Sequence, residues 1–485
     1  MIASYCINPS QEHTIEALAD KLLKFKLDTL ETLIGKGAKK IQTDMLDLNT
    51  LAKYSVSKAY ITHKLSSKLL KELKNNNLEN LFFDIEMPTL SILTDMEDIG
   101  IKIDEKFLND FNTNIIKEIS LLENKIFSLS NQEFNINSPK QLAEILFEKL
   151  KLPVTKKTKT GYSTDESVLL ELNEYEIAKE ILKYRELQKI KTTYIDSMLR
   201  YCQFEGSRIH TIFNQAVTTT GRLSSSEPNL QNIPNRTDYG RQLRKAFIAD
   251  TGKIFISADY SQIDLRALAH ISNDPTLITA FNTGKDIHTA TAMEIFSVTD
   301  EKDVTRQMRS AAKSINFGIV YGMSAFGLSK QLSIPIGQAK EYIDNYFKRY
   351  NGVKQWTFDI IEQTKKTGFV KTLSGRIRYI PEINSQNKQI VAFGERMTLN
   401  TPIQGTSADI IKIAMINISK KIKEQSLNSK LLLQVHDDLL FEVPKQEENI
   451  MLKMIKYEME QAMKLKVPLV VDIKVGINWA EMDKI

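Results

Sequence analysis

The segment Leu431–Val443 (LLLQVHDDLLFEV) constrains the fold more than any other part of this chain. Two apolar runs of strand-forming residues flank His436-Asp437-Asp438, and this pattern predicts a β-hairpin with two carboxylates at its tip. Adjacent carboxylates on a rigid sheet edge would attract a divalent cation, because Mg²⁺ prefers oxygen ligands. Taken alone, however, the segment is more simply interpreted as an ordinary acidic turn, since Asp is a common turn residue.

Composition excludes several classes of protein but leaves the binding partner open. The length of 485 residues predicts about three domains, and a net charge of +5 neither requires nor excludes nucleic acid. Cys6 and Cys202 match no metal or redox spacing and indicate a reducing compartment. No segment approaches the ~20 apolar residues of a membrane span, and Met1–Thr14 lacks the pattern of a signal peptide. We therefore expect a cytoplasmic protein, located in the cytosol or in a nucleoid within it.

Helices are expected in the first half of the chain. Helical stretches are predicted at Thr14–Lys26 and Ala59–Lys74, a long amphipathic helix at Asp104–Ser130 and a second long helix at Glu174–Phe204. Ser138-Pro139-Lys140-Gln141 predicts a further helix start, with a capping-box pattern and proline at the first position. The lysine-rich loop Lys149–Gly161 fits a solvated loop and a phosphate contact about equally well.

The second half mixes strands with helices. Strands are expected at Arg208–Phe213, Lys253–Ala258 and Val467–Val475, with a further hairpin at Phe369–Tyr379. Between the first two strands, Val217–Asn235 is expected to be an irregular loop. Helices are expected throughout Gln262–Thr367, at Lys388–Leu399 and Thr406–Gln425 on either side of Thr401-Pro402, and at Glu447–Lys464.

A third carboxylate, Asp259, follows an apolar strand within Ile254–Arg266 (IFISADYSQIDLR). Placed beside Asp437, it would complete a carboxylate site for metal. Two carboxylates that bracket two divalent ions suit in-line phosphoryl displacement, in which the ions stabilise the attacking and leaving oxygens. The alternative for a lone Asp after a strand is a helix N-cap.

The segment Arg309–Tyr321 (RSAAKSINFGIVY) places two cations and two aromatic rings at four-residue steps. Steps of this length keep all four side chains on one broad helical face: Arg309, Lys313, Phe317 and Tyr321. Such a face would present charge to a triphosphate and rings to a base. The alternative is a helix with a solvated basic end and a buried aromatic end. It suits Tyr321 less well, because glycines at 318 and 322 thin the packing around that ring.

The segment Thr218–Pro234 gathers small hydroxyls, one arginine and several amides. Arg222, Gln231 and Asn232 are groups that bond phosphates and minor-groove acceptors without reading much sequence. The alternative is a turn-rich surface loop, although its leucine and isoleucine residues suggest that the loop is anchored to the core.

These segments resemble family A DNA polymerases, the bacterial DNA polymerase I type. The resemblance extends from Leu81 to Asn478-Trp479. It rests on six motifs in the family's order: TGRLSSSEPNLQNIP (Thr220–Pro234), DYSQIDLR (Asp259–Arg266), DIHTATA (Asp286–Ala292), RSAAKSINFGIVYG (Arg309–Gly322), NTPIQGTSADIIK (Asn400–Lys412) and QVHDDLLFEV (Gln434–Val443).

The resemblance implies an α+β right-hand fold with an antiparallel-sheet palm, helical fingers and a long-helix thumb. The expected boundaries are 1–83 for a truncated 3′–5′ exonuclease-like remnant, 84–215 for the thumb, 216–270 and 395–485 for the palm, and 271–394 for the fingers. It also implies template-directed DNA synthesis, in which a primer 3′-hydroxyl attacks the α-phosphate of a deoxynucleoside triphosphate and pyrophosphate leaves. The expected cofactor is two Mg²⁺ ions, the partner is primer–template DNA, and the protein is expected to be a monomer.

The resemblance also assigns roles to individual residues. Catalytic roles fall on Asp259, Asp437, Asp438 and Lys313, and metal ligation on Asp259, Asp437 and the backbone carbonyl of Tyr260. Lys313 is also a candidate proton donor to pyrophosphate. Nucleotide contacts are expected from Arg309, Lys313, Phe317, Tyr321, His288, Gln262 and Asp264. DNA contacts are expected from Arg222, Gln231, Asn232, Arg396, Asn400, Gln404, His436, Lys157 and Lys159. Phenylalanine at 317 implies poor acceptance of chain terminators that lack the 3′-hydroxyl.

Two acids depart from the family's usual glutamate. Asp438 is one methylene shorter and supports the metal site less surely than Asp437. Asp264 stands at the position that excludes a ribose 2′-hydroxyl, so we hypothesise weakened sugar discrimination. A third departure is Lys58, four residues after Tyr54, where the exonuclease motif normally has Asp. A lysine cannot ligate Mg²⁺, so we predict no proofreading, and no 5′-nuclease segment is expected either.

Two other classes of protein are weighed against this interpretation. A DNA-binding scaffold without catalysis would lack one of Asp259, Asp437 or Lys313, and all three are present. A single-subunit RNA polymerase or a reverse transcriptase can share a palm. The acid at position 264 and the TGRLSS segment argue against both of these.

Overall fold

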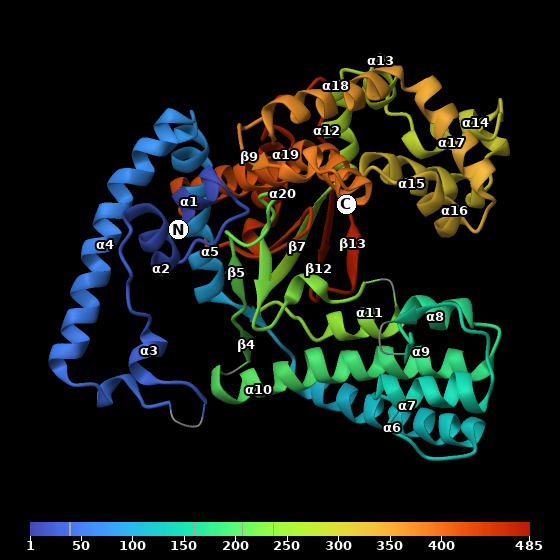
Figure 1. The fold of residues 1–485 in the computed structure, drawn as a ribbon, viewed down its shortest axis with the longest axis horizontal. Coiled ribbons are helices and arrows are strands. Elements are labelled where there is room, and N and C mark those ends of the chain that lie inside the picture. The colour runs from blue at the N-terminus through green and yellow to red at the C-terminus, as the bar shows by residue number, and fades with distance from the viewer. Residues whose placement is uncertain (38–39, 159–160, 206, 236) are drawn as a thin grey trace.

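The computed structural model describes residues 1–37, 40–158, 161–205, 207–235 and 237–485. A five-stranded antiparallel sheet lies at its centre, with the strand order β10-β11-β7-β12-β13 (Figure 1). The strands span Lys430–Val435 (β10), Asp438–Pro444 (β11), Lys253–Tyr260 (β7), Val471–Gly476 (β12) and Met482–Lys484 (β13). With long helices on both sides of this sheet, the expected α+β class is confirmed.

The hairpin β10–β11 forms as predicted because its apolar residues are covered by the rest of the molecule. The residues from Leu431 to Val435 and from Leu439 to Pro444 are all buried. His436 turns the chain with a φ of 59°. The last strand begins later than expected, at Val471, and β13 was not predicted because it is short and largely exposed.

Helices α5 (Met87–Ile99), α19 (Lys388–Glu424) and α20 (Glu448–Glu460) pack against the sheet. Their apolar side chains belong to one hydrophobic core together with β7, β10, β11 and β12. Burial of this shared apolar surface is the main force that holds the helices on the sheet.

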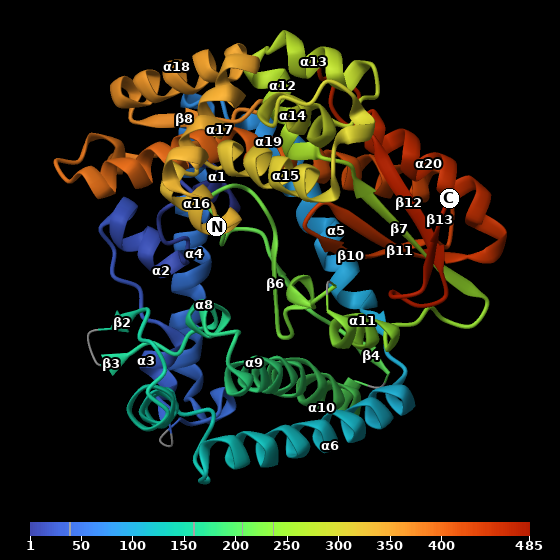
Figure 2. The ribbon, with the colours of Figure 1, turned by 90° about the vertical axis from the view of Figure 1, so that its right-hand side faces the viewer.

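The same core continues into a helical arm below the sheet in Figures 1 and 2. Helix α6 (Glu105–Ser130) packs along a continuous helix made of α9 (Glu176–Lys189), η6 (Ile190–Ile195) and α10 (Asp196–Glu205), so both predicted long helices are confirmed. Shorter elements complete the arm: β1 (Ile101–Lys102), α7 (Pro139–Ala143), η5 (Glu144–Lys149), β2 (Lys157–Thr158), β3 (Gly161–Tyr162) and α8 (Glu166–Glu171).

The expected capping box at Ser138 forms only in part. The Ser138 hydroxyl accepts from the Gln141 backbone N–H at 3.4 Å, as an N-cap should. The Gln141 side-chain oxygen accepts instead from the backbone N–H of Asn135 at 2.7 Å. The second half of the box is lost because a preceding turn, which sequence spacing does not reveal, offers a closer donor.

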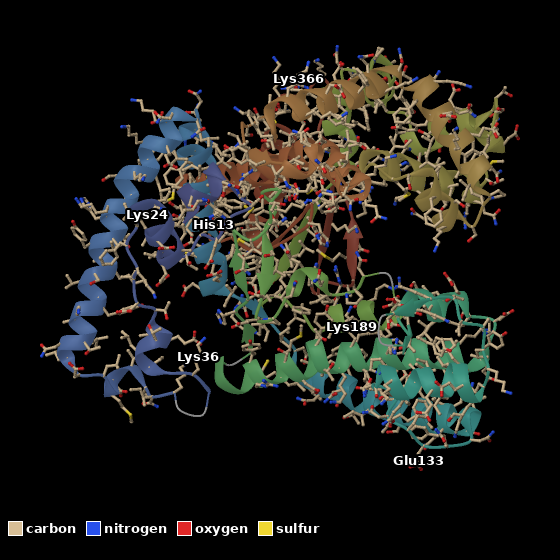
Figure 3. The ribbon with its side chains drawn as sticks, in the orientation of Figure 1. His13, Lys24, Lys36, Glu133, Lys189 and Lys366 are labelled. Atoms are coloured by element: carbon tan, nitrogen blue, oxygen red, sulfur yellow. The ribbon has the colours of Figure 1, made fainter. Side chains whose placement is uncertain are left out.

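A second lobe of helices lies above the sheet and has its own core. Its helices are α12 (Ile263–Ser272), α13 (Pro275–Asn282), α14 (Ile287–Ile295), α15 (Arg306–Val320), α16 (Ala325–Leu332), α17 (Ile336–Arg349) and α18 (Asn351–Thr367). Glu133 at the end of the arm and Lys366 in α18 mark opposite ends of the molecule (Figure 3). The sheet therefore lies between two helical bodies. The hairpin β8–β9 (Phe369–Lys371 and Ile377–Tyr379) follows as predicted.

The prediction of two helices around Pro402 is wrong, because α19 runs through it as one helix of 37 residues. Proline removes one backbone hydrogen bond and crowds the preceding turn. Thr398, Thr401, Pro402 and Ile403 are all buried, so packing from neighbouring elements holds the helix together there. Tertiary burial thus overrides a local helix breaker.

The segment Val217–Asn235 is also more ordered than expected. It contains β6 (Ser224–Ser226) and the 3-10 turn η7 (Leu230–Asn232). The predicted strand before it divides into β4 (Arg208–Ile209), which pairs with β1, and β5 (Ile212–Asn214), which pairs with β6. Hydroxyl contacts in the interior stabilise this arrangement, because Thr211 and Ser225 are buried with their oxygens 2.6 Å apart.

The N-terminal part is helical and runs along one side of the molecule (Figure 1). It comprises α1 (Ile2–Ile7), α2 (Ile15–Leu18), η1 (Ala19–Leu23), α3 (Leu30–Ile34) and α4 (Leu48–Asn75), followed by η4 (Leu81–Glu86). Among the described helices, none combines the length and apolar character needed to cross a membrane.

A buried ionic cluster joins this N-terminal part to the rest. The Arg376 guanidinium contacts Glu86, and it bonds Asp409 at 2.6 and 3.1 Å. Lys412 donates to Glu86 at 2.8 Å, and all four side chains are at most 2% exposed. Burial alone would raise the pKa of Glu86, but Lys412 and Arg376 lower it to about 2. Every member of the cluster therefore needs the others as counter-charges.

We predict that Arg376→Ala lowers the free energy of unfolding by roughly 3–5 kcal/mol, because it leaves Asp409 buried without its cation and leaves Glu86 with Lys412 alone. Arg349→Ala, which removes a pair to Glu294 that is almost half exposed on both sides, is the matched control and should cost at most about 1 kcal/mol. Urea unfolding followed by circular dichroism measures both. Equal losses for the two variants would contradict the prediction.

Candidate active site

Strand pairing brings acidic residues from distant segments to one end of the sheet. Asp438 on β11 lies opposite Asp259 on β7 in the antiparallel register. The backbone N–H of Tyr260 donates to the carbonyl of Asp437 at 3.1 Å. Asp259 and Asp437, predicted from separate motifs, therefore lie at the same sheet end.

These carboxylates line a polar cavity of about 520 Å³. Its wall combines acidic, basic and amide groups: Asp259, Asp437, Asp438, Arg244, Lys474, Gln231, Asn232 and His436. The mixture of cations and amides around a carboxylate centre suits a ligand that carries phosphates.

All three carboxylates of this site have a pKa above that of an ordinary aspartate. Loss of hydration, followed by repulsion from Asp437 and Asp438, raises the pKa of Asp259 to about 7. Burial also raises the pKa of Asp437, and it raises the pKa of Asp438 to about 6. A bound cation would relieve this repulsion, so the charges of the site suit a divalent metal.

The ligands predicted for Mg²⁺ are all oxygen donors, the kind that this ion prefers: the carboxylates of Asp259 and Asp437 and the backbone carbonyl of Tyr260. Within the part of the chain that the structure describes, no group of three or more His, Cys, Asp or Glu side chains is arranged to hold a metal. A set of two carboxylates leaves positions for water and substrate phosphates, which is how Mg²⁺ commonly binds in phosphoryl-transfer sites.

Asp438 differs from the other two acids because it is held by the protein. The Ser257 hydroxyl lies 2.8 and 3.0 Å from its two carboxylate oxygens. Ser257 and Asp259 lie two residues apart on β7 and so share one face of the strand. The shorter Asp438 is therefore better suited to supporting the site than to binding metal directly.

Helix α15 presents the predicted face of cations and rings. Arg309 and Lys313 are exposed, whereas Phe317 is half-buried. The rings of Phe317 and Tyr321 stack with centroids 6.4 Å apart. Arg309 donates to Asp286 at 2.6 and 2.8 Å, so this cation is held at the first turn of α14. The exposed lysine and the stacked rings remain accessible along one side of the helix.

Asp264 links this helix to the sheet. Its carboxylate accepts from the Tyr321 hydroxyl at 2.7 Å, from Arg222 at 3.2 Å and from the Ser407 hydroxyl at 2.6 Å. Asp264 is itself buried, five residues after Asp259. Three elements thus converge on one carboxylate, and the shorter acid still reaches all of them.

His288 lies behind the ring of Phe317, with centroids 5.9 Å apart. The ring is buried, and its Nδ1 is 3.0 Å from the side-chain nitrogen of Asn316. Burial lowers the pKa of His288 to about 4, so the ring is neutral at neutral pH. A neutral imidazole can donate one hydrogen bond to a ligand.

Helix α19 carries a row of three predicted DNA contacts at four-residue spacing. Arg396 is exposed and lies over the Phe393 ring at 5.7 Å. The Asn400 side-chain oxygen is buried without a partner among the described residues. Gln404 bonds the Tyr321 hydroxyl, which ties the end of the row to α15.

The remaining predicted residues are placed less uniformly. His436 is exposed at the hairpin tip, Gln262 is half-buried at the start of α12, and Lys157 is exposed on β2. Gln231 is buried and donates to the side chain and carbonyl of Gln434 at 3.0 Å each. Its amide N–H groups are therefore committed within the protein, because burial requires partners. Lys159 lies outside the described residues.

The sequence did not single out three residues that the structure places at this site: Ser257, Lys474 and Asn316. Ser257 could have been found from its position two residues before Asp259. Lys474 lies opposite Ser257 in the β12–β7 register, which needs knowledge of the strand order. Asn316 lies within a predicted motif but on the buried side of α15.

We predict a pH-dependent gain in stability for Asp259→Asn when metal is removed with EDTA. Because the pKa of Asp259 rises on folding to about 7, the wild type loses stability as pH rises through that value, and the variant does not. The gain at pH 8 should be on the order of 1 kcal/mol, since solvent screens this exposed residue, and should vanish near pH 4. Thermal melting measures it. Asp95→Asn on α5, whose carboxylate pairs with Lys423 at 3.4 Å, is the control. A gain at pH 4 equal to that at pH 8 would refute the prediction.

Comparison with known proteins agrees with this geometry. The sequence model of DNA polymerase family A matches residues 105–481. DNA polymerase I of Geobacillus stearothermophilus is 46% identical over 482 residues, which cover 99% of this chain and 55% of that protein. DNA polymerase I of Bacillus subtilis (strain 168) is 45% identical over 482 residues, which cover 99% and 54%. The chain thus spans about half the length of these curated relatives.

A solved structure shows the same fold. It is described as the POL domain of Pol1 from M. smegmatis in complex with DNA primer-template and dNTP, and it superposes with a TM-score of 0.90 at 39% identity. The match covers 99% of this chain and 81% of that one. Together with the family match, this shows that the chain belongs to DNA polymerase family A.

Proposed function

We propose that this chain is a template-directed DNA polymerase that extends a primer 3′ end with deoxynucleotides. The observation that carries the proposal is the bond from Tyr321 to Asp264, at 2.7 Å. It ties the cationic, aromatic face of α15 to the residues that directly follow Asp259. A triphosphate held by that face would have its α-phosphate near the carboxylate end of the sheet.

The residues divide into three roles. Asp259 and Asp437, with the Tyr260 carbonyl, would hold two Mg²⁺ ions, which when bound neutralise phosphate charge and favour attack by the 3′-hydroxyl. Arg309, Lys313 and His288 would hold the triphosphate, and Lys313 would give a proton to the leaving pyrophosphate. Phe317 and Tyr321 would pack on the incoming nucleotide and the nascent base pair, and Gln262 would contact the nucleotide.

The proposed DNA contacts are Asn232 and His436 on the wall of the cavity, Arg396, Asn400 and Gln404 in the row on α19, and Arg222 beside Asp264. Gln231 would support this wall through its contact with Gln434. Lys157 would contact duplex backbone from the arm.

The two helical bodies would act as thumb and fingers. We propose residues 84–215 as the thumb, 216–270 with 395–485 as the palm, and 271–394 as the fingers, with 1–83 as an exonuclease-like remnant. A monomer in the cytoplasm, associated with the nucleoid, suits this activity. Absence of proofreading stays a prediction. It is supported by Lys58, which lies 3.2 Å from the Tyr54 hydroxyl and 3.7 Å from Glu16 in place of a carboxylate.

We predict that Asp259→Ala and Asp437→Ala each lower primer extension by at least about 10³-fold, because each removes a metal ligand worth several kcal/mol to the transition state. Single-turnover extension of a labelled primer measures the loss. Asp95→Asn changes an exposed carboxylate on α5 that pairs with Lys423, and it should extend normally. Normal extension by both alanine variants would overturn the metal assignment.

We also predict that Asp264→Glu raises discrimination against ribonucleotides. The longer acid would occupy more of the space beside the incoming sugar, and the expected gain in selectivity is about tenfold, or 1.4 kcal/mol. Single-nucleotide insertion kinetics with deoxy- and ribonucleoside triphosphates measures it. Unchanged selectivity, with extension of deoxynucleotides intact, would show that the shorter acid does not leave usable space.

A further inference from the structure

Four buried polar side chains form a continuous chain behind the proposed nucleotide face. The Tyr350 hydroxyl is 3.0 Å from the Thr291 hydroxyl, which is 3.1 Å from the Asn316 side-chain oxygen. The Asn316 nitrogen is 3.0 Å from Nδ1 of His288. All four residues are at most 3% exposed. Each group must therefore find its partners inside the protein.

The direction of these hydrogen bonds follows from counting donors. Tyr350 is buried, and Thr291 is the one hydrogen-bond partner of its hydroxyl among the described residues. If Tyr350 did not donate to Thr291, its buried O–H would have no acceptor, and an unsatisfied buried donor destabilises the fold. Thr291, having accepted from Tyr350, gives its single hydrogen to the Asn316 oxygen. The Asn316 nitrogen is then turned toward His288.

This orientation decides which nitrogen of His288 carries the proton. An amide nitrogen only donates, so Nδ1 must accept and therefore has no hydrogen. In a neutral ring the hydrogen is then on Nε2, for which the described residues offer no partner. Asp286, Arg309 and Lys313 are the charged groups that surround this ring. Burial is the main cause that keeps it neutral; Asp286 opposes this, and the two cations, each with a weaker effect than Asp286, support it.

We propose that Asn316 is a positioning residue that fixes His288 as its Nε2–H tautomer, so that a neutral imidazole donates to the triphosphate of the incoming nucleotide. The inference rests on the proposed polymerase function for its ligand, but the tautomer itself is a property of the free protein. A neutral donor keeps its hydrogen bond over the whole working pH range, whereas the opposite tautomer would point a lone pair at the phosphate.

The tautomer is measured by ¹⁵N NMR of the free protein. Of the six histidines, His288 is assigned by the signal that disappears in His288→Gln. We expect Nδ1 to show the shift of an unprotonated nitrogen and Nε2 that of a protonated one between pH 6 and 8.5. A protonated Nδ1 in the wild type would overturn the proposal whatever the activity.

Asn316→Asp tests the link to the nucleotide. A carboxylate accepts and cannot donate, so it favours hydrogen on Nδ1 and leaves the lone pair of Nε2 facing the phosphate. We expect KM for the deoxynucleoside triphosphate to rise about tenfold or more at pH 8.5, the loss of one hydrogen bond to a charged group, with a smaller change in kcat. The new carboxylate also raises the pKa of His288 in the variant, so the ratio of variant to wild-type KM should fall toward pH 6, where the variant's ring becomes doubly protonated and Nε2–H returns.

Two further variants separate positioning from folding. Thr291→Val removes the donor that orients Asn316, and it should give a mixture of tautomers and an intermediate KM. Asn345→Asp makes the same chemical change on α17, outside the chain of hydrogen bonds, and should leave the tautomer and KM unchanged. A pH-independent rise in KM for Asn316→Asp, or the expected tautomer with an unchanged KM, would overturn the role toward the nucleotide. Failure of the polymerase proposal would appear separately, as absence of primer extension by the wild type.

Discussion

The pairing of β7 with its two neighbours is the constraint on which the site depends. The β11–β7 register places Asp438 opposite Asp259, and the β12–β7 register places Lys474 opposite Ser257. Because strand side chains alternate between the two faces, a shift by one residue would turn Asp259 to the other face of the sheet. Most residues of β7, β10 and β11 are buried on both faces of the sheet, so such a shift would force each side chain into a space packed for its neighbour. The packing of these strands thus holds Asp259, Asp437 and Asp438 close together, although their negative charges repel one another.

A second chain of contacts connects the buried ionic cluster around Arg376 to the helical lobe above the sheet. The buried guanidinium of Arg376 packs against Gly221, where a Cβ atom would lie 2.5 Å from its Nε. Gly221 also has a φ of +89°, so only glycine allows this close approach without strain. The next residue, Arg222, bonds Asp264, and Asp264 bonds Tyr321. The buried ionic cluster therefore reaches the nucleotide face through only three further residues.

Much of the architecture could be predicted from local patterns. The apolar period of α6, the proline at the start of α5 and the hairpin β10–β11 all appeared as expected. The wrong prediction concerned Pro402, because local rules count the lost hydrogen bond but not the packing that surrounds it. The division of Arg208–Phe213 into β4 and β5 escaped prediction for a similar reason, since each half pairs with a different partner.

The sequence by itself singled out the groups that we propose to meet phosphate and metal, because motif spacing on a helix or strand decides which side chains share a face. For Asp259, Asp437 and the row from Arg309 to Tyr321, spacing left simpler structural roles open, and the resemblance to the family decided between them. Only the tertiary structure decided how these groups are supported. Ser257 holds Asp438, Asp264 collects three donors, and Asn316 meets His288. These contacts join residues 28 to 181 positions apart, and such pairs are set by how sheets and helices pack rather than by any local pattern.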